Sequence, residues 1–110
     1  MKNLFIGNAF SLSMITPPAT IIVKEVTTEE VNNLLENYEY KSCIGHESTA
    51  ALISKILKKP ISVNRVSIKL EKGDKLVVFQ LLVRLQEGTV LGEEELANLP
   101  FRFYLIDIIY

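Results

Sequence analysis

The chain has a single histidine, His46, and its neighbours are residues that suit phosphate chemistry. Imidazole exchanges protons near neutral pH, so it can act as a proton donor to a bound ligand. A helical apolar pattern starts just after His46, and the unpaired backbone N–H groups at the start of a helix favour an anion. Gly45 would let a ligand approach the backbone, and Ser48 and Thr49 would add hydroxyl donors. This stretch could therefore bind a phosphate while His46 supplies a proton.

A purely structural interpretation of the same residues competes with the catalytic one. Ser48 or Glu47 would cap the helix, and His46 would be an ordinary surface residue. Local spacing alone favours this structural interpretation. The choice between the two therefore depends on polar residues elsewhere in the chain.

Polar residues in and after a predicted central strand are the next candidates. Gln80 interrupts an otherwise apolar run at 75–83, which predicts a strand covered on both faces. A buried amide without hydrogen bonds costs about 1 to 3 kcal/mol, so Gln80 should satisfy a neighbour or face a cavity. Arg84 and Glu87 come just past this strand, where open α/β sheets tend to bind ligands. The alternative for these two is a solvated ion pair, worth under about 1 kcal/mol.

Two further pairs of polar residues are weaker candidates. Asn8 and Ser11 follow the first predicted strand and could reach the same edge of the sheet, but their spacing is common in loops. Asn64 and Arg65 come after Pro60 and could simply be the exposed opening of a strand. Neither pair has a function that its spacing alone establishes.

The elements that must position these residues are strands interspersed with helices. Apolar and β-branched runs predict strands at 3–8, 20–26, 63–70, 75–83 and 101–110, whereas 40–44 is ambiguous. Helices are predicted at 28–38, 47–58 and 92–99. The order indicates an α/β (α+β) fold: a mixed β-sheet of about five strands flanked by two or three helices, in a single small domain over 1–110.

The two longer predicted helices carry their own signals. Thr27 and Glu30 have the spacing of a capping box at the start of 28–38. In 47–58 the helical periodicity predicts an apolar face centred on Ala51, Leu52 and Ile56, with Ile53 and Leu57 less central. Pro60 stops this second helix.

Composition narrows the classes of function. The 12 Lys and Arg against 13 Asp and Glu give a net charge of -1, which offers no general attraction for duplex nucleic acid. Cys43 is the only cysteine and no Cys/His spacing suits zinc, so an intracellular protein without a metal is expected. The N-terminal apolar stretch is too short for a secretory signal, and no run is long enough to cross a membrane. We expect a soluble, cytoplasmic protein without membrane contact.

Five short motifs taken together resemble a known family. They are NAFSLSM at 8–14, IGHEST at 44–49, NRVSIKL at 64–70, GDK at 73–75 and RLQEGTVL at 84–91. In this order they resemble the viral anti-CRISPR ring nucleases of the type III system and their cellular relatives, over nearly the whole chain. The resemblance implies a homodimer that binds cyclic tetra-adenylate across its two-fold interface and cleaves it without metal or cofactor. The ribose 2′-hydroxyl would attack the adjacent phosphorus and leave a 2′,3′-cyclic phosphate.

The resemblance also implies roles for individual residues. His46 falls on the family's catalytic histidine and would be the general acid, while Glu87 falls on the glutamate beside the reacting ribose. Arg84 could neutralise charge on the phosphorus oxygens. The positions that match ligand contacts are Ser11, Ser48, Gln80 and Arg84, followed by Asn8, Asn64 and Arg65.

Two other functions remain open from the sequence. A non-catalytic dimer could capture a cyclic oligonucleotide or a protein partner, with His46 merely contacting phosphate. A DNA-binding regulator is the third possibility, but it needs a basic groove that the composition does not favour.

Overall fold

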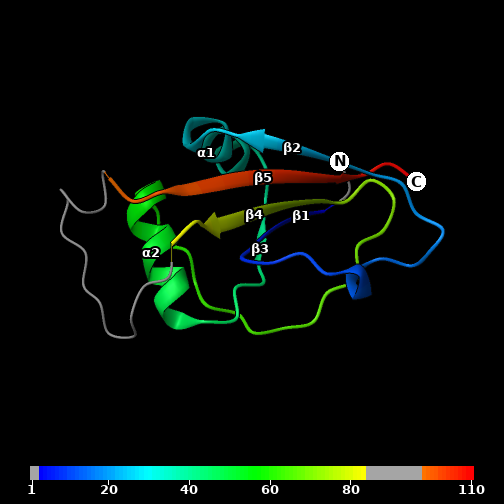
Figure 1. Ribbon diagram of the computed structural model, residues 1–110, viewed down its shortest axis with the longest axis horizontal. Coiled ribbons are helices and arrows are strands. Elements are labelled where there is room, and N and C mark those ends of the chain that lie inside the picture. Colours follow the sequence, from blue (N-terminus) through cyan, green and yellow to red (C-terminus); the bar gives the residue numbers. More distant parts are fainter. Residues whose placement is uncertain (1–2, 84–97) are drawn as a thin grey trace.

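The computed structural model describes residues 3–83 and 98–110, and their order of elements matches most of the predicted one. The elements are β1 (Leu4–Gly7), a 3-10 helix η1 (Leu12–Met14), β2 (Ile21–Val26), α1 (Thr28–Asn37), β3 (Lys41–Ser42), α2 (Glu47–Leu57), β4 (Lys75–Leu81) and β5 (Phe101–Ile108). The five strands form one mixed sheet, and two helices accompany it (Figure 1). The predicted fold class is therefore confirmed.

The strand order brings the ends of several strands to one edge of the sheet. The order is β2-β5-β4-β1-β3, with β1 parallel to both β3 and β4, and with β5 antiparallel to β4 and β2. Four strands therefore run in the same direction, as the leftward arrows of β2 and β4 show in Figure 1, and β5 runs in the opposite direction. We call the edge where these four strands end the carboxyl edge.

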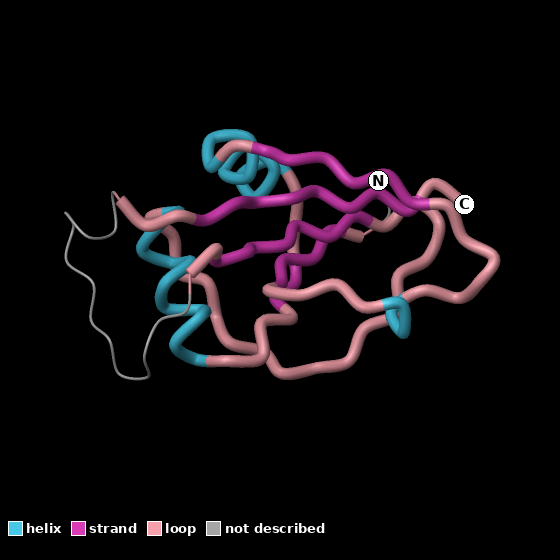
Figure 2. Tube along the Cα trace, in the orientation of Figure 1, coloured by secondary structure: helices cyan, strands magenta, loops and turns pink. Residues whose placement is uncertain are grey.

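The two faces of the sheet are covered differently. Both helices pack on one face, where Val31 and Leu35 of α1 and Ile53 of α2 join a core that includes Phe79 and Phe103. The other face, on which neither α1 nor α2 packs, carries a second apolar cluster, over which Phe10, Met14 of η1, Ile15 and Ile68 pack. We call this second face the helix-free face. Figure 2 shows how much of the molecule between η1 and α2 consists of loops.

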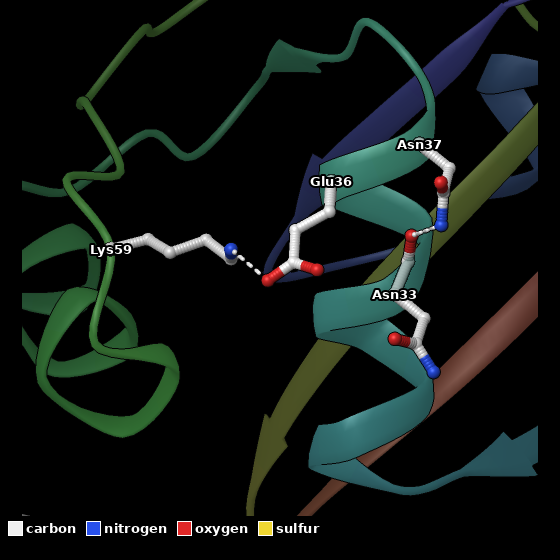
Figure 3. Close-up of polar contacts among 4 residues, drawn as sticks. All are labelled: Asn33, Glu36, Asn37 and Lys59. Atoms are coloured by element: carbon white, nitrogen blue, oxygen red, sulfur yellow. Dashed lines mark hydrogen bonds and ion pairs between the residues drawn. The ribbon is translucent and has the colours of Figure 1, made fainter.

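Side-chain contacts fix both ends of α1. The predicted capping box is present in α1: Thr27 Oγ1 accepts the Glu30 N–H at 3.1 Å, and Glu30 Oε1 accepts the Thr27 N–H at 3.2 Å. At the other end of α1, Lys59 Nζ bonds Glu36 Oε1 at 3.1 Å and Asn37 donates to the Asn33 carbonyl at 2.7 Å (Figure 3). The Lys59 contact ties the end of α1 to the segment that follows α2.

Two predictions about the elements need correction, and one ambiguous stretch is now assigned. The apolar face of α2 is centred on Ala50, Ile53 and Leu57, whereas Ala51 is exposed. No strand forms over 63–70, because its backbone N–H groups bond two different segments: Asn64 donates to Ile44 and Leu70 donates to Met14. The ambiguous stretch 40–44 contains the short parallel strand β3. The helix predicted at 92–99 falls largely on 84–97, outside the described residues.

Candidate functional site at the carboxyl edge of the sheet

Three parallel neighbours, β1, β4 and β3, deliver polar residues to the carboxyl edge. Asn8 follows the end of β1, and the stretch from Ile44 to His46 follows β3. Gly7 pairs with Val78, so Gln80 lies two residues, roughly 7 Å, beyond the end of β1. Parallel strand ends of this kind are where open α/β sheets bind ligands. The structure thus brings Asn8, His46 and Gln80 to one edge.

His46 is the N-cap residue of α2, with an extended backbone (φ -129°, ψ 131°). Its carbonyl accepts the Ala50 N–H at 3.0 Å, but its side chain makes no capping hydrogen bond. The imidazole is exposed, as the structural interpretation expected, whereas capping by Ser48 or Glu47 is wrong. No N-cap side chain accepts the N–H groups of the first turn of α2, and the exposed imidazole lies beside them.

Fully buried Ile44 anchors the residues just before the helix. Its side chain lies in the core beneath the helices, and Gly45 and His46 follow it to the surface. Among the described residues, a Cβ built at Gly45 would meet Arg65 Cγ alone, at 3.7 Å. The described part of the chain therefore leaves space beside the Gly45 backbone next to Arg65, and the approach of a ligand there stays a prediction.

Asn64 and Arg65 lie beside the same segment, although they do not open a strand. The Asn64 backbone N–H donates to the Ile44 carbonyl and its side-chain amide donates to the Ser42 carbonyl, both at 2.8 Å. Ser42 in turn donates its hydroxyl to the Ser62 carbonyl at 2.6 Å. Asn64 thus has a structural role that holds this loop, and Arg65 with it, against the approach to α2.

Gln80 is exposed, so the prediction that it is buried is wrong. Its neighbours Leu76 and Val78 belong to the helix-free face, and side chains two residues apart on a strand share a face. The pairing of β1 with β4 ends at Gly7 and Val78, so within the described residues Gln80 has no strand partner on that side of β4. Because Gln80 is exposed, its amide is available to a ligand. Water can satisfy its hydrogen bonds, so the energetic cost of an unpaired buried amide does not apply.

Arg102 of β5 is a further polar residue at this edge, one that sequence reasoning did not single out. It pairs directly with Gln80 across β4 and β5. Its Nε lies 3.3 Å from Glu25 Oε1 and its Nη1 3.5 Å from the Tyr104 hydroxyl. The Tyr104 hydroxyl and then the charge of Glu25 raise the pKa of the guanidinium. The alternation of polar and apolar residues in FRFYLIDI was the signal that could have placed Arg102 on a sheet surface.

Ser11 lies apart from His46 within one chain. It is the N-cap of η1, where its Oγ accepts the Ser13 N–H at 3.1 Å. Lys69 Nζ donates to the Ser13 carbonyl and holds η1 against the segment before β4. Figure 1 shows η1, the short blue helix, well to the right of α2.

The remaining predicted site residues are distributed as follows. Ser48 is exposed in the first turn of α2. Arg84 and Glu87 fall on 84–97, outside the described residues, and their roles stay predictions. Within the described residues, no group of three or more His, Cys, Asp or Glu side chains could hold a metal ion. Neither α1 nor α2 has the length and apolar character that crossing a membrane requires.

Comparison with known proteins shows relatives in viruses and bacteria. The chain is 37% identical over 108 residues to Uncharacterized protein 26 of Sulfolobus islandicus filamentous virus, covering 96% of this chain and 92% of the viral one. It is 34% identical over 95 residues to Uncharacterized protein YddF of Bacillus subtilis strain 168, covering 84% and 88% of the two chains.

A solved structure and a family model agree with these relatives. The structure of B116 of Sulfolobus turreted icosahedral virus (STIV) matches with a TM-score of 0.84 and 29% identity, covering 96% of this chain and 98% of that chain. The family model described as STIV B116-like matches residues 4–103, which include β1 to β4 and the first part of β5. The chain therefore belongs to the STIV B116-like family.

Proposed function

We propose that this protein is a metal-independent ring nuclease that binds cyclic tetra-adenylate and cleaves it to linear products with a 2′,3′-cyclic phosphate. Destroying this second messenger would shut down type III CRISPR defence. The observation that carries the proposal is His46: an exposed imidazole at the N-cap of α2, with its side chain not used for capping. The identity of the substrate is inferred from the motif that contains His46, and from the order of this and the other motifs along the chain.

The chemistry needs a proton donor more than it needs a metal. The ribose 2′-hydroxyl loses its proton to water as its oxygen forms a bond to the adjacent phosphorus. The bond from phosphorus to the 5′-oxygen breaks, and that oxygen takes a proton from the general acid. Because the nucleophile belongs to the substrate, correct orientation supplies much of the rate. In the proposal His46 gives this proton as general acid, and the first-turn N–H groups of α2 together with Ser48 hold the phosphate.

The other proposed site residues would bind the cyclic ligand and take no part in the transfer of the proton from His46. Asn8 and Gln80 reach the carboxyl edge and would contact the ligand there, with Arg65 beside Gly45. Glu87 is proposed to lie beside the reacting ribose, and Arg84 to neutralise charge on the phosphorus oxygens. Ser11 would meet a different part of the ring, since it lies apart from His46.

We propose further that the active form is a homodimer. A cyclic tetranucleotide has two-fold symmetry, so two copies of this chain would present two equivalent phosphate sites across their axis. Two local sites of this kind need no positive net charge, which fits the value of -1. The oligomeric state is measurable by light scattering in the absence and presence of the ring.

The experiment that tests the function uses cyclic tetra-adenylate with excess EDTA. The wild-type protein should convert it to linear product ending in a 2′,3′-cyclic phosphate, and Lys55→Ala, an exposed change in α2, should do the same. Binding without any product would instead identify a non-catalytic capture protein. Product that appears only when divalent metal is restored would contradict the proposed chemistry.

A further inference from the structure

Arg102 and Gln80 lie side by side on the helix-free face. They are direct partners in the antiparallel pair β4 and β5, and such partners project from the same face of a sheet. The next pair along the ladder on this face is Val78 with Tyr104, and both belong to the cluster of the helix-free face. Arg102 therefore stands next to a residue of the proposed ligand site.

The contacts that hold Arg102 are exposed and leave it able to exchange partners. The side chains of Arg102 and Glu25 are 52% and 59% exposed, and their closest atoms are 3.3 Å apart. The Tyr104 hydroxyl is 3.5 Å from Nη1, at the long end of hydrogen-bond distances. A guanidinium has five N–H donors in a planar fork, so two such contacts occupy only part of its capacity. An anion that accepts two hydrogen bonds from the guanidinium would bind it more strongly than Glu25 does through its single exposed contact.

We propose that Arg102 is a phosphate-binding residue of the ring nuclease site, which exchanges Glu25 for a phosphodiester of the ring when the ligand lies against Gln80. Tyr104 keeps the guanidinium on the helix-free face, and Glu25 neutralises it while no ligand is bound. A guanidinium fork matches two oxygens of a phosphodiester, which an amide such as Gln80 does not. Arg102 then sets affinity for the ring and takes no part in proton transfer. This inference rests on the proposed function.

Single-turnover cleavage of cyclic tetra-adenylate over a range of protein and salt concentrations tests the inference. Arg102→Gln should raise the half-saturating concentration about tenfold and leave the maximal rate within about twofold of wild type. The slope of log affinity against log salt should fall in magnitude by roughly 0.7 for each phosphate that the variant no longer neutralises. Glu25→Gln, which removes the competing carboxylate, should lower the half-saturating concentration.

Lys24→Gln is the matched control. It removes the same charge from the neighbouring strand, but Lys24 pairs with Leu105, whose side chain faces the helices. Thermal unfolding verifies that each variant is folded, and Arg102→Lys, which keeps the charge but not the fork, should give an intermediate affinity. If Arg102→Gln saturates at the same concentration and with the same salt slope as Lys24→Gln, Arg102 binds no phosphate and the inference is overturned, while the ring nuclease function stands. If wild type neither binds nor cleaves the ring, both the function and this inference fall.

Discussion

The thiol of Cys43 lies directly over the α-carbon of Gly7: a Cβ added to Gly7 would come within 2.8 Å of Cys43 Sγ. The two residues end β1 and extend β3, and the Cys43 N–H and Sγ both bond the Ile6 carbonyl, at 2.8 Å and 3.4 Å. This close approach holds together the two chain segments that continue to Asn8 and to His46. The geometry of the carboxyl edge thus depends on glycine at position 7.

The first prediction is that Gly7→Ala destabilises the fold through Cys43. Adding a methyl group to a packed site typically costs about 1 to 3 kcal/mol, and urea unfolding should report a loss in this range. Cys43→Ala removes the sulfur that the new methyl group meets, so Gly7→Ala should cost much less in that background. Equal losses in the two backgrounds would mean that Cys43 is not the cause.

The second prediction concerns the reactivity of the Cys43 thiol. Burial raises its pKa, because the thiolate loses solvation, so less thiolate is present at a given pH than in a free thiol. Iodoacetamide at pH 8 should therefore alkylate Cys43 in the folded protein more slowly than in urea. A folded rate equal to the rate of free cysteine would contradict this.

The raised pKa of Cys43 also predicts how the free energy of unfolding changes with pH. Since the folded pKa lies above the unfolded one, the stabilising contribution is fully present below the unfolded thiol pKa. It is lost as pH rises through the folded pKa, because unfolding then releases a proton. Cys43→Ser should flatten this alkaline decline, which urea unfolding between pH 7 and 10 can measure (roughly the range around an ordinary thiol pKa).

The third prediction contrasts two serines of α2. The Ser54 hydroxyl donates to the Ala50 carbonyl at 2.7 Å and accepts the Ile61 N–H at 2.9 Å, so Ser54→Ala leaves a backbone donor without its partner. A loss of about 1 to 3 kcal/mol in the free energy of unfolding is expected, with cleavage retained in the folded protein. Ser48→Ala should do the reverse: unchanged stability and weaker ring binding. Loss of both properties in either variant would show that the two roles are not separable.

The fourth prediction concerns the capping box of α1. Thr27→Ala removes the acceptor of the Glu30 N–H and should cost about 1 kcal/mol of stability. Thr27→Ser keeps the hydroxyl and should cost less. Because α1 carries none of the proposed site residues, both variants should cleave the ring at the wild-type rate at temperatures where they are folded. A slowed rate in folded Thr27→Ala protein would connect α1 to the site.

Local signals in the sequence predicted the elements well. The capping box located the start of α1, and the start of α2 at Glu47 was predicted to the residue. These features depend on residues close together in the chain, whose types and spacing determine hydrogen bonds within one turn.

Features that depend on neighbouring segments were not predictable in the same way. The exposure of Gln80 follows from β1 ending opposite Val78, a matter of register between two strands far apart in the chain that no local pattern carries. The absence of a strand at 63–70 follows from its bonding to two separate segments, near Ile44 and near Met14. Arg102 was overlooked because its place beside Gln80 depends on the order of the strands. Residue types suggested the chemistry, but only the topology brought Asn8, His46 and Gln80 to one edge.

The rate of ring cleavage by His46→Ala, measured in EDTA under single-turnover conditions, tests the central claim most directly. If His46 is the general acid, the maximal rate should fall by about 100-fold to 10,000-fold, while binding of cyclic tetra-adenylate changes far less. His46→Gln, which can still hydrogen-bond phosphate but transfers no proton, should be impaired to a similar degree. Cleavage by His46→Ala at the wild-type rate would contradict the account.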